Sequence, residues 1–148
     1  MLGSGSLTTY QHMSIRTFLV EDSPVIRDNL IEALHELSPV QVVGVAADES
    51  AAVDWLASAD NECDLVIIDI FLKHGSGLGV LRALTDSRRP LVVLSNYLSA
   101  DMRSKCLELG ASALFDKSNE IDALLDYCAR LPAGKPRANP ATRHPGAA

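Results

Sequence analysis

The sequence has no excess of positive charge, and this absence argues against one large class of function. Lys and Arg together number 13 against 19 Asp and Glu, so the formal net charge is −6. Nucleic-acid binding normally rests on a basic surface that neutralises phosphates. We therefore expect no direct contact with nucleic acid.

Long apolar runs and a cysteine framework are also missing. The longest apolar run, around residues 65–68, is far shorter than the roughly 20 residues that span a bilayer. No charged segment followed by an apolar one stands near the N-terminus. The three cysteines are widely spaced within apolar segments, which indicates core residues rather than disulfide pairs or a metal site. These features predict a cytoplasmic protein without membrane contact.

Composition along the chain predicts one folded domain between two tails. With 148 residues, 47% of them hydrophobic, the chain is long enough for one buried core and too short for two ordinary domains. Residues 1–13 are small and polar, so we expect a disordered N-terminal segment or a cloning remnant there. Residues 132–148 are rich in Pro and Ala, with basic but no acidic residues, which predicts a flexible basic tail. The domain is expected over residues 14–131.

Between these tails, short apolar runs alternate with helical patterns, which is typical of an α/β fold built on a parallel sheet. The run Leu65–Ile68 is apolar at every position, as expected for a central strand covered by helices on both faces. The predicted strands are residues 15–20, 40–45, 65–69, 91–95 and 113–116.

The segments between the strands carry helix signals. Ser23 and Pro24 are a capping residue followed by proline at the first helical position. After them, apolar residues recur at helical spacing: Ile26, Leu30, Leu34 and Leu37. Further helices are predicted between Ser99 and Gly110, after Ser118, and in shorter stretches around Val53 and Leu81.

Polar side chains stand where several predicted strands end. Because parallel strands of such a sheet end on the same side, these side chains should gather at the carboxyl edge, where ligands of open α/β sheets bind. They are Glu21 and Asp22 after the first strand, Asp69 at the third, Ser95 at the fourth and Lys117 after the fifth.

The three carboxylates of this set predict a divalent cation. Carboxylates that lie close together repel one another until one takes a proton or a cation joins them, and Lys117 supplies only one positive charge. Mg2+ typically uses one or two carboxylates, several waters and a phosphate oxygen. We therefore expect Asp22 and Asp69 to bind Mg2+ directly and Glu21 to bind it through water.

Phosphoryl transfer is the chemistry that these residues predict. An Asp carboxylate can attack phosphorus to form an acyl phosphate, and the transfer needs alignment and charge neutralisation more than an acid or a base. Asp69 is the expected acceptor. Lys117 would neutralise one side of the phosphoryl group, and Ser95 would offer its hydroxyl to a phosphoryl oxygen.

The combination of features at the strand ends is specific. It consists of the pair Glu21-Asp22, Asp69 with Gly77 eight residues later, Ser95, and Lys117 within GASALFDKS. With these features, residues 15–130 resemble the receiver domain of two-component response regulators, of the stand-alone, single-domain type. The resemblance implies a flavodoxin-like (βα)5 fold, a doubly wound parallel sheet with strand order 2-1-3-4-5.

The resemblance also implies a signalling switch rather than an enzyme. A histidine kinase or a histidine phosphotransfer protein would phosphorylate Asp69 in a Mg2+-dependent step, with the backbone carbonyl of Phe71 as a further metal ligand. The receiver would catalyse its own phosphorylation and its slow dephosphorylation. Phosphorylation would change the surface made by the fourth helix, fifth strand and fifth helix. That surface would bind a protein target or a second copy of the chain, or the phosphoryl group would pass onward.

The sequence departs from the family pattern near the site. Leu114 stands three residues before the lysine, where many receivers carry a Tyr or Phe that rotates inward. Tyr97 and Phe71, each two residues after a site residue, are the candidates to switch in its place or to shield the phosphoryl group from water. Lys73 and Ser118 stand where prolines are common, which affects loop geometry rather than chemistry.

Two other functions remain open. A receiver-fold module could act by interaction alone, without phosphorylation. An Asp-nucleophile phosphatase of the haloacid dehalogenase type uses a similar set of Asp, Ser or Thr, Lys and acidic groups. That class needs a second Asp two residues after the nucleophile, and this chain has Phe71 there, so turnover of phosphoesters is not expected.

Overall fold

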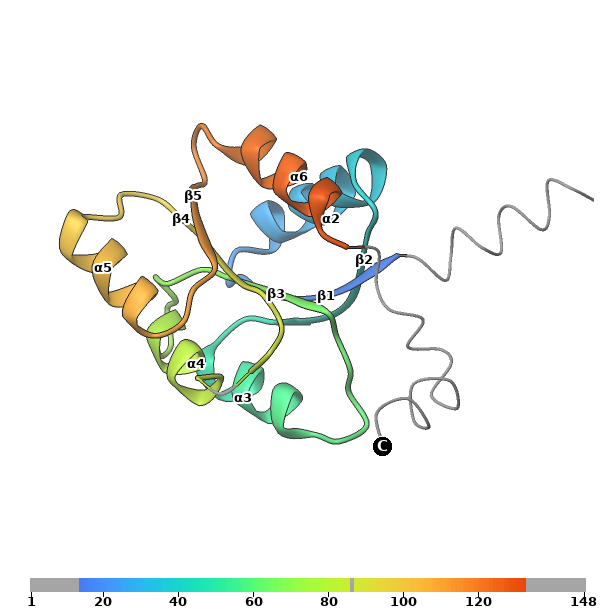
Figure 1. Ribbon diagram of the computed structural model, residues 1–148. Coiled ribbons are helices and arrows are strands. Elements are labelled where there is room, and N and C mark those ends of the chain that lie inside the picture. The colour runs from blue at the N-terminus through green and yellow to red at the C-terminus, as the bar shows by residue number, and fades with distance from the viewer. Residues whose placement is uncertain (1–13, 86, 133–148) are drawn as a thin grey trace, which may run out of the picture.

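The structure, a computed structural model, describes residues 14–85 and 87–132. Over these ranges five strands alternate with five helices (Figure 1), as the sequence predicts. The expected N-terminal segment 1–13, and the expected tail beyond Pro132, lie outside the described residues. The elements are β1 (Ile15–Val20), α2 (Pro24–Leu37), β2 (Val40–Ala46), α3 (Glu49–Ala57), β3 (Leu65–Ile68), α4 (Gly77–Ala83), β4 (Leu91–Ser95), α5 (Ala100–Glu108), β5 (Ala113–Asp116) and α6 (Ile121–Arg130).

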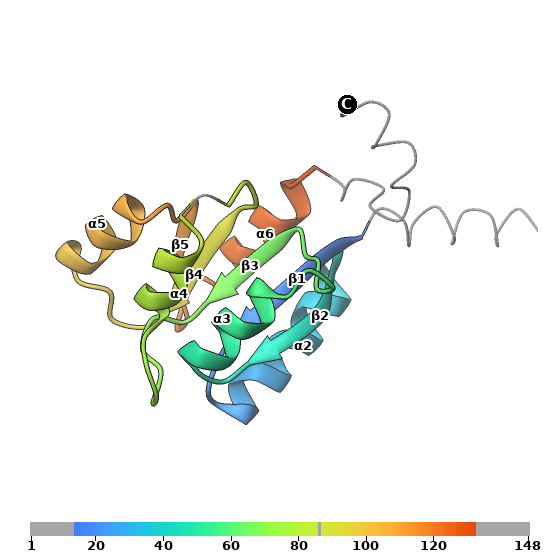
Figure 2. The ribbon, with the colours of Figure 1, turned by 90° about the horizontal axis from the view of Figure 1, so that it is seen from below.

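The strands form one parallel sheet in the order β2-β1-β3-β4-β5. Helices cover both of its faces: α2 and α6 lie on one side, and α3, α4 and α5 on the other (Figures 1 and 2). This is the flavodoxin-like, doubly wound fold predicted from the sequence. Because all strands run the same way, their carboxyl ends meet at one edge of the sheet.

Two apolar clusters, one on each face of the sheet, make up the core. The central strand β3 supplies both of them, since side chains along a strand alternate between its faces. Val66 and Ile68 pack toward α3, α4 and α5, whereas Leu65 and Ile67 pack toward α2 and α6. All four side chains are completely buried, which confirms the central position of this strand.

All three cysteines lie in this core. Cys63 and Cys106 belong to the cluster beneath α3, α4 and α5, and Cys128 belongs to the opposite one. Burial raises the pKa of the Cys106 thiol above its ordinary value and that of the Cys128 thiol from 9.0 to about 11. These two thiols therefore stay neutral at physiological pH and pack as small apolar groups.

Two strand ends differ from the predicted ones by a single residue. β2 extends one residue further than expected, and β3 ends at Ile68, so that Asp69 follows the strand. The Asp69 amide still donates to a β1 carbonyl at 3.0 Å. The next amide, that of Ile70, donates instead to the Ser95 hydroxyl at 2.9 Å. Directly after Asp69, a hydrogen bond to the Ser95 side chain thus takes the place of the backbone hydrogen bonds between strands.

The helices begin where the capping residues predict, with one exception. The Ser23 and Ser99 hydroxyls accept hydrogen bonds from backbone amides in the first turns of α2 and α5. Ser118 precedes α6 but does not cap it, because its hydroxyl donates to Asn96 Oδ1 at 2.8 Å. Glu120 occupies the cap position without a side-chain hydrogen bond. No helix within the described ranges is long and apolar enough to cross a membrane.

Trp55 on α3 is a packing residue. Its ring stacks on Phe18 of β1, with ring centroids 4.1 Å apart and an angle of 9° between the planes. The indole also lies directly over Gly44 of β2, where an added Cβ would come within 2.6 Å of the Trp55 Cε2 atom. Glycine is therefore needed for α3 to approach the edge strand this closely.

Candidate functional site

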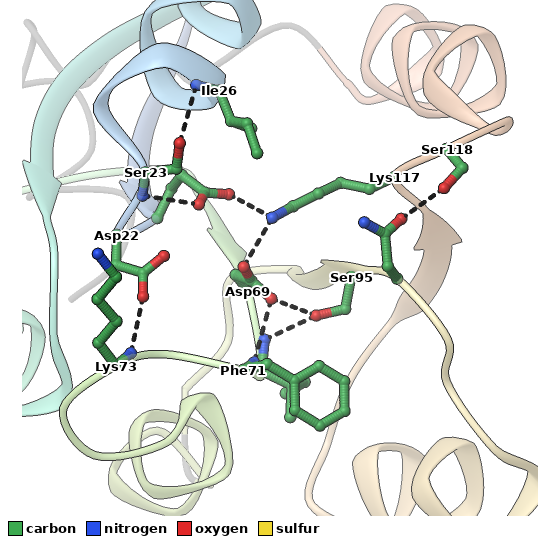
Figure 3. A network of polar contacts seen from close by, with 12 residues as sticks. Asp22, Ser23, Ile26, Asp69, Phe71, Lys73, Ser95, Lys117 and Ser118 are labelled. Atoms are coloured by element: carbon green, nitrogen blue, oxygen red, sulfur yellow. Dashed lines mark hydrogen bonds and ion pairs between the residues drawn. The ribbon is translucent and has the colours of Figure 1, made fainter.

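The polar residues predicted at the strand ends lie together at the carboxyl edge of the sheet (Figure 3). Lys117 Nζ lies 2.7 Å from Glu21 Oε1 and 2.7 Å from Asp69 Oδ2. The Ser95 hydroxyl donates to Asp69 Oδ1. Carboxylate oxygens of Glu21, Asp22 and Asp69 lie within 4.8 Å of one another. The fold thus brings all five predicted residues into one site.

The ion pairs of Lys117 are shielded from water. The side chains of Lys117, Glu21 and Asp69 are 11%, 3% and 7% exposed. Burial by itself lowers the pKa of the Lys117 ammonium, but the hydrogen bonds and negative charges of Asp69 and Glu21 together outweigh it and raise that pKa above its ordinary value. Lys117 is therefore a permanent cation, held between two carboxylates at neutral pH.

Asp69 is held in one orientation by contacts to both of its carboxylate oxygens. Oδ2 pairs with Lys117, and Oδ1 accepts hydrogen bonds from the Ser95 hydroxyl and, at 3.1 Å, from the Phe71 amide. The Ser95 hydroxyl accepts in turn from the Ile70 amide, which orients it toward Asp69. A carboxylate fixed in this way would lose little freedom in a reaction.

The charges and donor atoms of the site fit a hard divalent cation. Three carboxylates, on Glu21, Asp22 and Asp69, face one ammonium group, so an excess of two negative charges remains when all are ionised. Asp22 Oδ2 accepts a hydrogen bond from the Lys73 amide at 2.7 Å, and no described residue donates to the other Asp22 oxygen. An oxygen-only set of this size suits the coordination that hard cations prefer.

The residues predicted to switch or to shield occupy different environments. Leu114 is partly buried and packs against the cluster beneath α3, α4 and α5. Phe71 is 52% exposed, and its amide donates a hydrogen bond to the Asp69 carboxylate. Tyr97 is 88% exposed with a backbone φ of 57°, so a role in core packing is excluded. The shielding role, and the Phe71 carbonyl as a metal ligand, stay predictions.

Two further contributors were not among the residues predicted from the sequence. Glu49 on α3 accepts a hydrogen bond from the Ser76 amide at 2.9 Å and so fastens the loop between β3 and α4. Glu49 follows the end of β2, so the strand-end rule that selected the other acids applied to it as well. Asn96 Oδ1 accepts a hydrogen bond from the Ser118 hydroxyl and so joins the loops after β4 and β5. This contact forms only because the two loops lie side by side in the folded chain.

The sequence is similar to those of several bacterial proteins. The chain is 34% identical over 110 residues to protein-glutamate methylesterase/protein-glutamine glutaminase 5 of Myxococcus xanthus, a match that covers 72% of this chain and 31% of that protein. It is 32% identical over 111 residues to the transcriptional regulatory protein PdtaR of Mycobacterium tuberculosis, covering 74% of this chain and 53% of that one. The chain therefore spans only part of the length of each relative.

The fold of the chain is similar to that of a solved response regulator. The phosphorylated cyanobacterial phytochrome response regulator RcpA superposes with a TM-score of 0.63 at 26% identity, covering 78% of this chain and 89% of that chain. The sequence of residues 17–129 matches the response regulator receiver domain. With its strand order and its acidic carboxyl edge, the chain belongs to the family of response regulator receiver domains.

Proposed function

We propose that this receiver accepts a phosphoryl group on Asp69 from a histidine kinase or a histidine phosphotransfer protein. The observation that supports this most strongly is the position of Asp69 between Lys117 and Ser95, beside the carboxylates of Glu21 and Asp22. Each neighbour supplies charge or alignment, which are the two requirements of phosphoryl transfer. Membership of the receiver family implies a histidine kinase partner.

In the proposed transfer, a carboxylate oxygen of Asp69 attacks the phosphorus of a phosphohistidine. The bond between phosphorus and the histidine nitrogen breaks, the imidazole takes up a proton, and Asp69 becomes an acyl phosphate. Lys117 offsets charge on the phosphoryl oxygens, and Ser95 turns its hydroxyl from Asp69 to one of them. In dephosphorylation, water attacks the phosphorus, inorganic phosphate leaves, and the Asp69 carboxylate is restored.

The proposed ligands of Mg2+ are Asp22 and Asp69 directly, Glu21 through water, and the backbone carbonyl of Phe71. When bound, Mg2+ supplies positive charge that offsets the carboxylates and the arriving phosphoryl group. The cation would offset part of the negative charge of Glu21, so the Lys117 ammonium could pair with a phosphoryl oxygen instead. Removal of divalent cations with EDTA should therefore abolish phosphorylation.

The proposed output is a change in protein binding. Residues 14–131 would form the signalling unit, in the cytoplasm and without direct contact to nucleic acid or membrane. The surface of α5, β5 and α6, on which Leu107 is 54% exposed, is the candidate site for a protein target or for a homodimer. Alternatively the phosphoryl group is relayed to a further histidine. In either case the chain acts as a switch with self-catalysed phosphorylation and dephosphorylation rather than as an enzyme with turnover.

Intact-mass measurement after incubation with acetyl phosphate and Mg2+ tests this function. Wild type should gain the mass of one phosphoryl group, and Asp69→Asn should gain nothing. Asp54→Asn, which alters an exposed carboxylate on α3, is the matched control and should behave as wild type. A gain in Asp69→Asn would overturn the choice of acceptor. No gain in any variant would favour the interaction module that works without phosphorylation.

A further inference from the structure

Glu49, the first residue of α3, connects this helix to the loop between β3 and α4. Its Oε1 accepts a hydrogen bond from the Ser76 amide at 2.9 Å, and its own amide donates to the His74 carbonyl at 3.3 Å. The side chain is half-buried although the neighbouring loop residues His74 and Gly75 are exposed. Glu49 thus accepts one hydrogen bond from the loop and donates another to it, and together they hold the segment His74–Ser76 against the start of α3.

Two glycines lie so close to the Glu49 side chain that neither position has room for a Cβ atom. Gly75 has a φ of +82°, and a side chain there would collide with Glu49 Cβ. A side chain on Gly79, in the first turn of α4, would collide with the Glu49 carboxylate itself. The carboxylate therefore lies directly against the amino end of α4, where its Oε1 accepts the hydrogen bond from the Ser76 amide.

The same loop is bound on its other side to the acidic cluster. The Lys73 amide donates to Asp22 Oδ2 at 2.7 Å (Figure 3). Lys73 is one residue from His74 and three from Ser76, the two loop positions that Glu49 holds. Asp22 is itself only half-buried and lies in the connection after β1. The loop is also closed by the bridge between Phe71 and Ser76, and Glu49 is the contact that holds its His74–Ser76 part against α3. The orientation of Asp22 therefore depends on a loop that Glu49 helps to fasten.

We propose that Glu49 is a positioning residue for the divalent cation, acting through the loop and Asp22 rather than by contact with the metal. This inference rests on the proposed function, since it takes the cluster of Glu21, Asp22 and Asp69 to be the cation site. Without the Glu49 carboxylate the loop gains freedom, the Lys73 amide leaves Asp22, and ordering that ligand again weakens metal binding. Partners that orient metal ligands have effects of this kind in other proteins.

Calorimetric titration with Mg2+ of the metal-free chain tests the proposal. Wild type must bind first, and absence of binding there would overturn the proposed cation site together with this inference. Glu49→Ala is expected to weaken the affinity by about tenfold. Glu49→Gln keeps an oxygen that can accept from Ser76, so it should retain most of the affinity. Asp54→Ala, which removes one exposed negative charge from the same helix, is the matched control for long-range electrostatics and should bind as wild type.

Amide hydrogen exchange without metal supplies a readout that does not depend on binding. Glu49→Ala should speed the exchange of the Lys73 and Ser76 amides, while the amides of β3 stay protected. Gly79→Ala keeps Glu49 but displaces its carboxylate, so it should have the same two effects, and it serves if Glu49→Ala fails to fold. Wild-type Mg2+ affinity in a folded Glu49→Ala or Gly79→Ala variant would overturn the inference and leave the proposed function intact.

Discussion

At the residue scale, the site depends on one ammonium group shared by two carboxylates. Lys117 contacts Glu21 and Asp69 at equal distances of 2.7 Å, so it is the counter-charge of the proposed acceptor, Asp69, in the unphosphorylated chain. A phosphoryl group would offer Lys117 new oxygens. Under the proposed function, Lys117 would exchange carboxylate oxygens for phosphoryl oxygens, which suits a switch between two populations.

Replacement of the shared cation should therefore affect stability in a metal-dependent way. Lys117→Met keeps the length of the side chain but leaves two buried carboxylates without a counter-charge, which we expect to cost about 3 kcal/mol of unfolding free energy in EDTA. Mg2+ should restore part of this loss. Urea unfolding with and without Mg2+ measures both effects, with Lys105→Met on the exposed side of α5 as a control. Equal stability of Lys117→Met and wild type in EDTA would contradict the structural role assigned to the pair.

The aromatic residues beside the site lead to a second prediction at this scale. The double variant Phe71→Asn, Tyr97→Glu should shorten the lifetime of the acyl phosphate severalfold, because polar side chains admit water that apolar rings exclude. Phe71 should carry more of the effect, since Tyr97 is the more exposed of the two. The lifetime is read from the decay of phosphorylated mass after the donor is removed. An unchanged lifetime in the double variant would exclude shielding by either ring.

At the scale of elements, the helix and strand positions followed from local patterns, whereas the loop contacts did not. Ser23 and Ser99 cap their helices as predicted, because a cap needs only the amides two or three residues ahead. Ser118 lies at an equally suitable place but bonds to Asn96 instead. Sequence patterns predict only the hydrogen-bond partners within a residue's own segment. A loop side chain such as that of Ser118 can instead bond to a residue of a different loop, which the pattern does not predict.

The contact between α3 and the edge strand β2 gives a prediction at this scale. Gly44→Ala would place a methyl group 2.6 Å from the Trp55 ring, which must then leave its stacked position on Phe18. We expect a loss of about 1–3 kcal/mol in unfolding free energy, the usual cost of overpacking a core. Fluorescence of the single tryptophan during urea unfolding reports it.

A neighbouring substitution on the same strand controls for the strand itself. Val45 is 42% exposed, and Val45→Thr keeps a β-branched side chain, so its effect should stay within about 0.5 kcal/mol. If Gly44→Ala were as stable as this control, the close approach of Trp55 to β2 would not constrain the fold.

At the scale of the whole molecule, the folded chain should lose stability in alkaline solution. Folding raises the pKa values of Lys117, Tyr127, Cys106 and Cys128, the last from 9.0 to about 11. Each group then holds its proton in the folded state at a pH where the unfolded chain releases it, so folding binds protons and stability falls as pH rises. The contribution of Cys128 is fully present below about pH 9 and is lost between pH 9 and about 11.

Urea unfolding at a series of pH values from neutral to about 11 measures this loss. Cys128→Ala removes one of the four groups, and it should reduce the slope of stability against pH in this window while lowering stability throughout, because it leaves a small cavity. A slope equal to that of wild type would show that the Cys128 thiol does not titrate as its burial in the core predicts.

The sequence by itself determined the fold, the two-sided core and the edge at which the site forms. It could do so because apolar runs define the strands, parallel strands end at one edge of the sheet, and the resemblance to receiver domains implies the strand order. Only the tertiary structure decided that Lys117 is shared between Glu21 and Asp69, and that Glu49 anchors the loop beside Asp22. These contacts join segments far apart in the chain, and their partners are selected by distance, burial and charge, which exist only once the sheet has assembled.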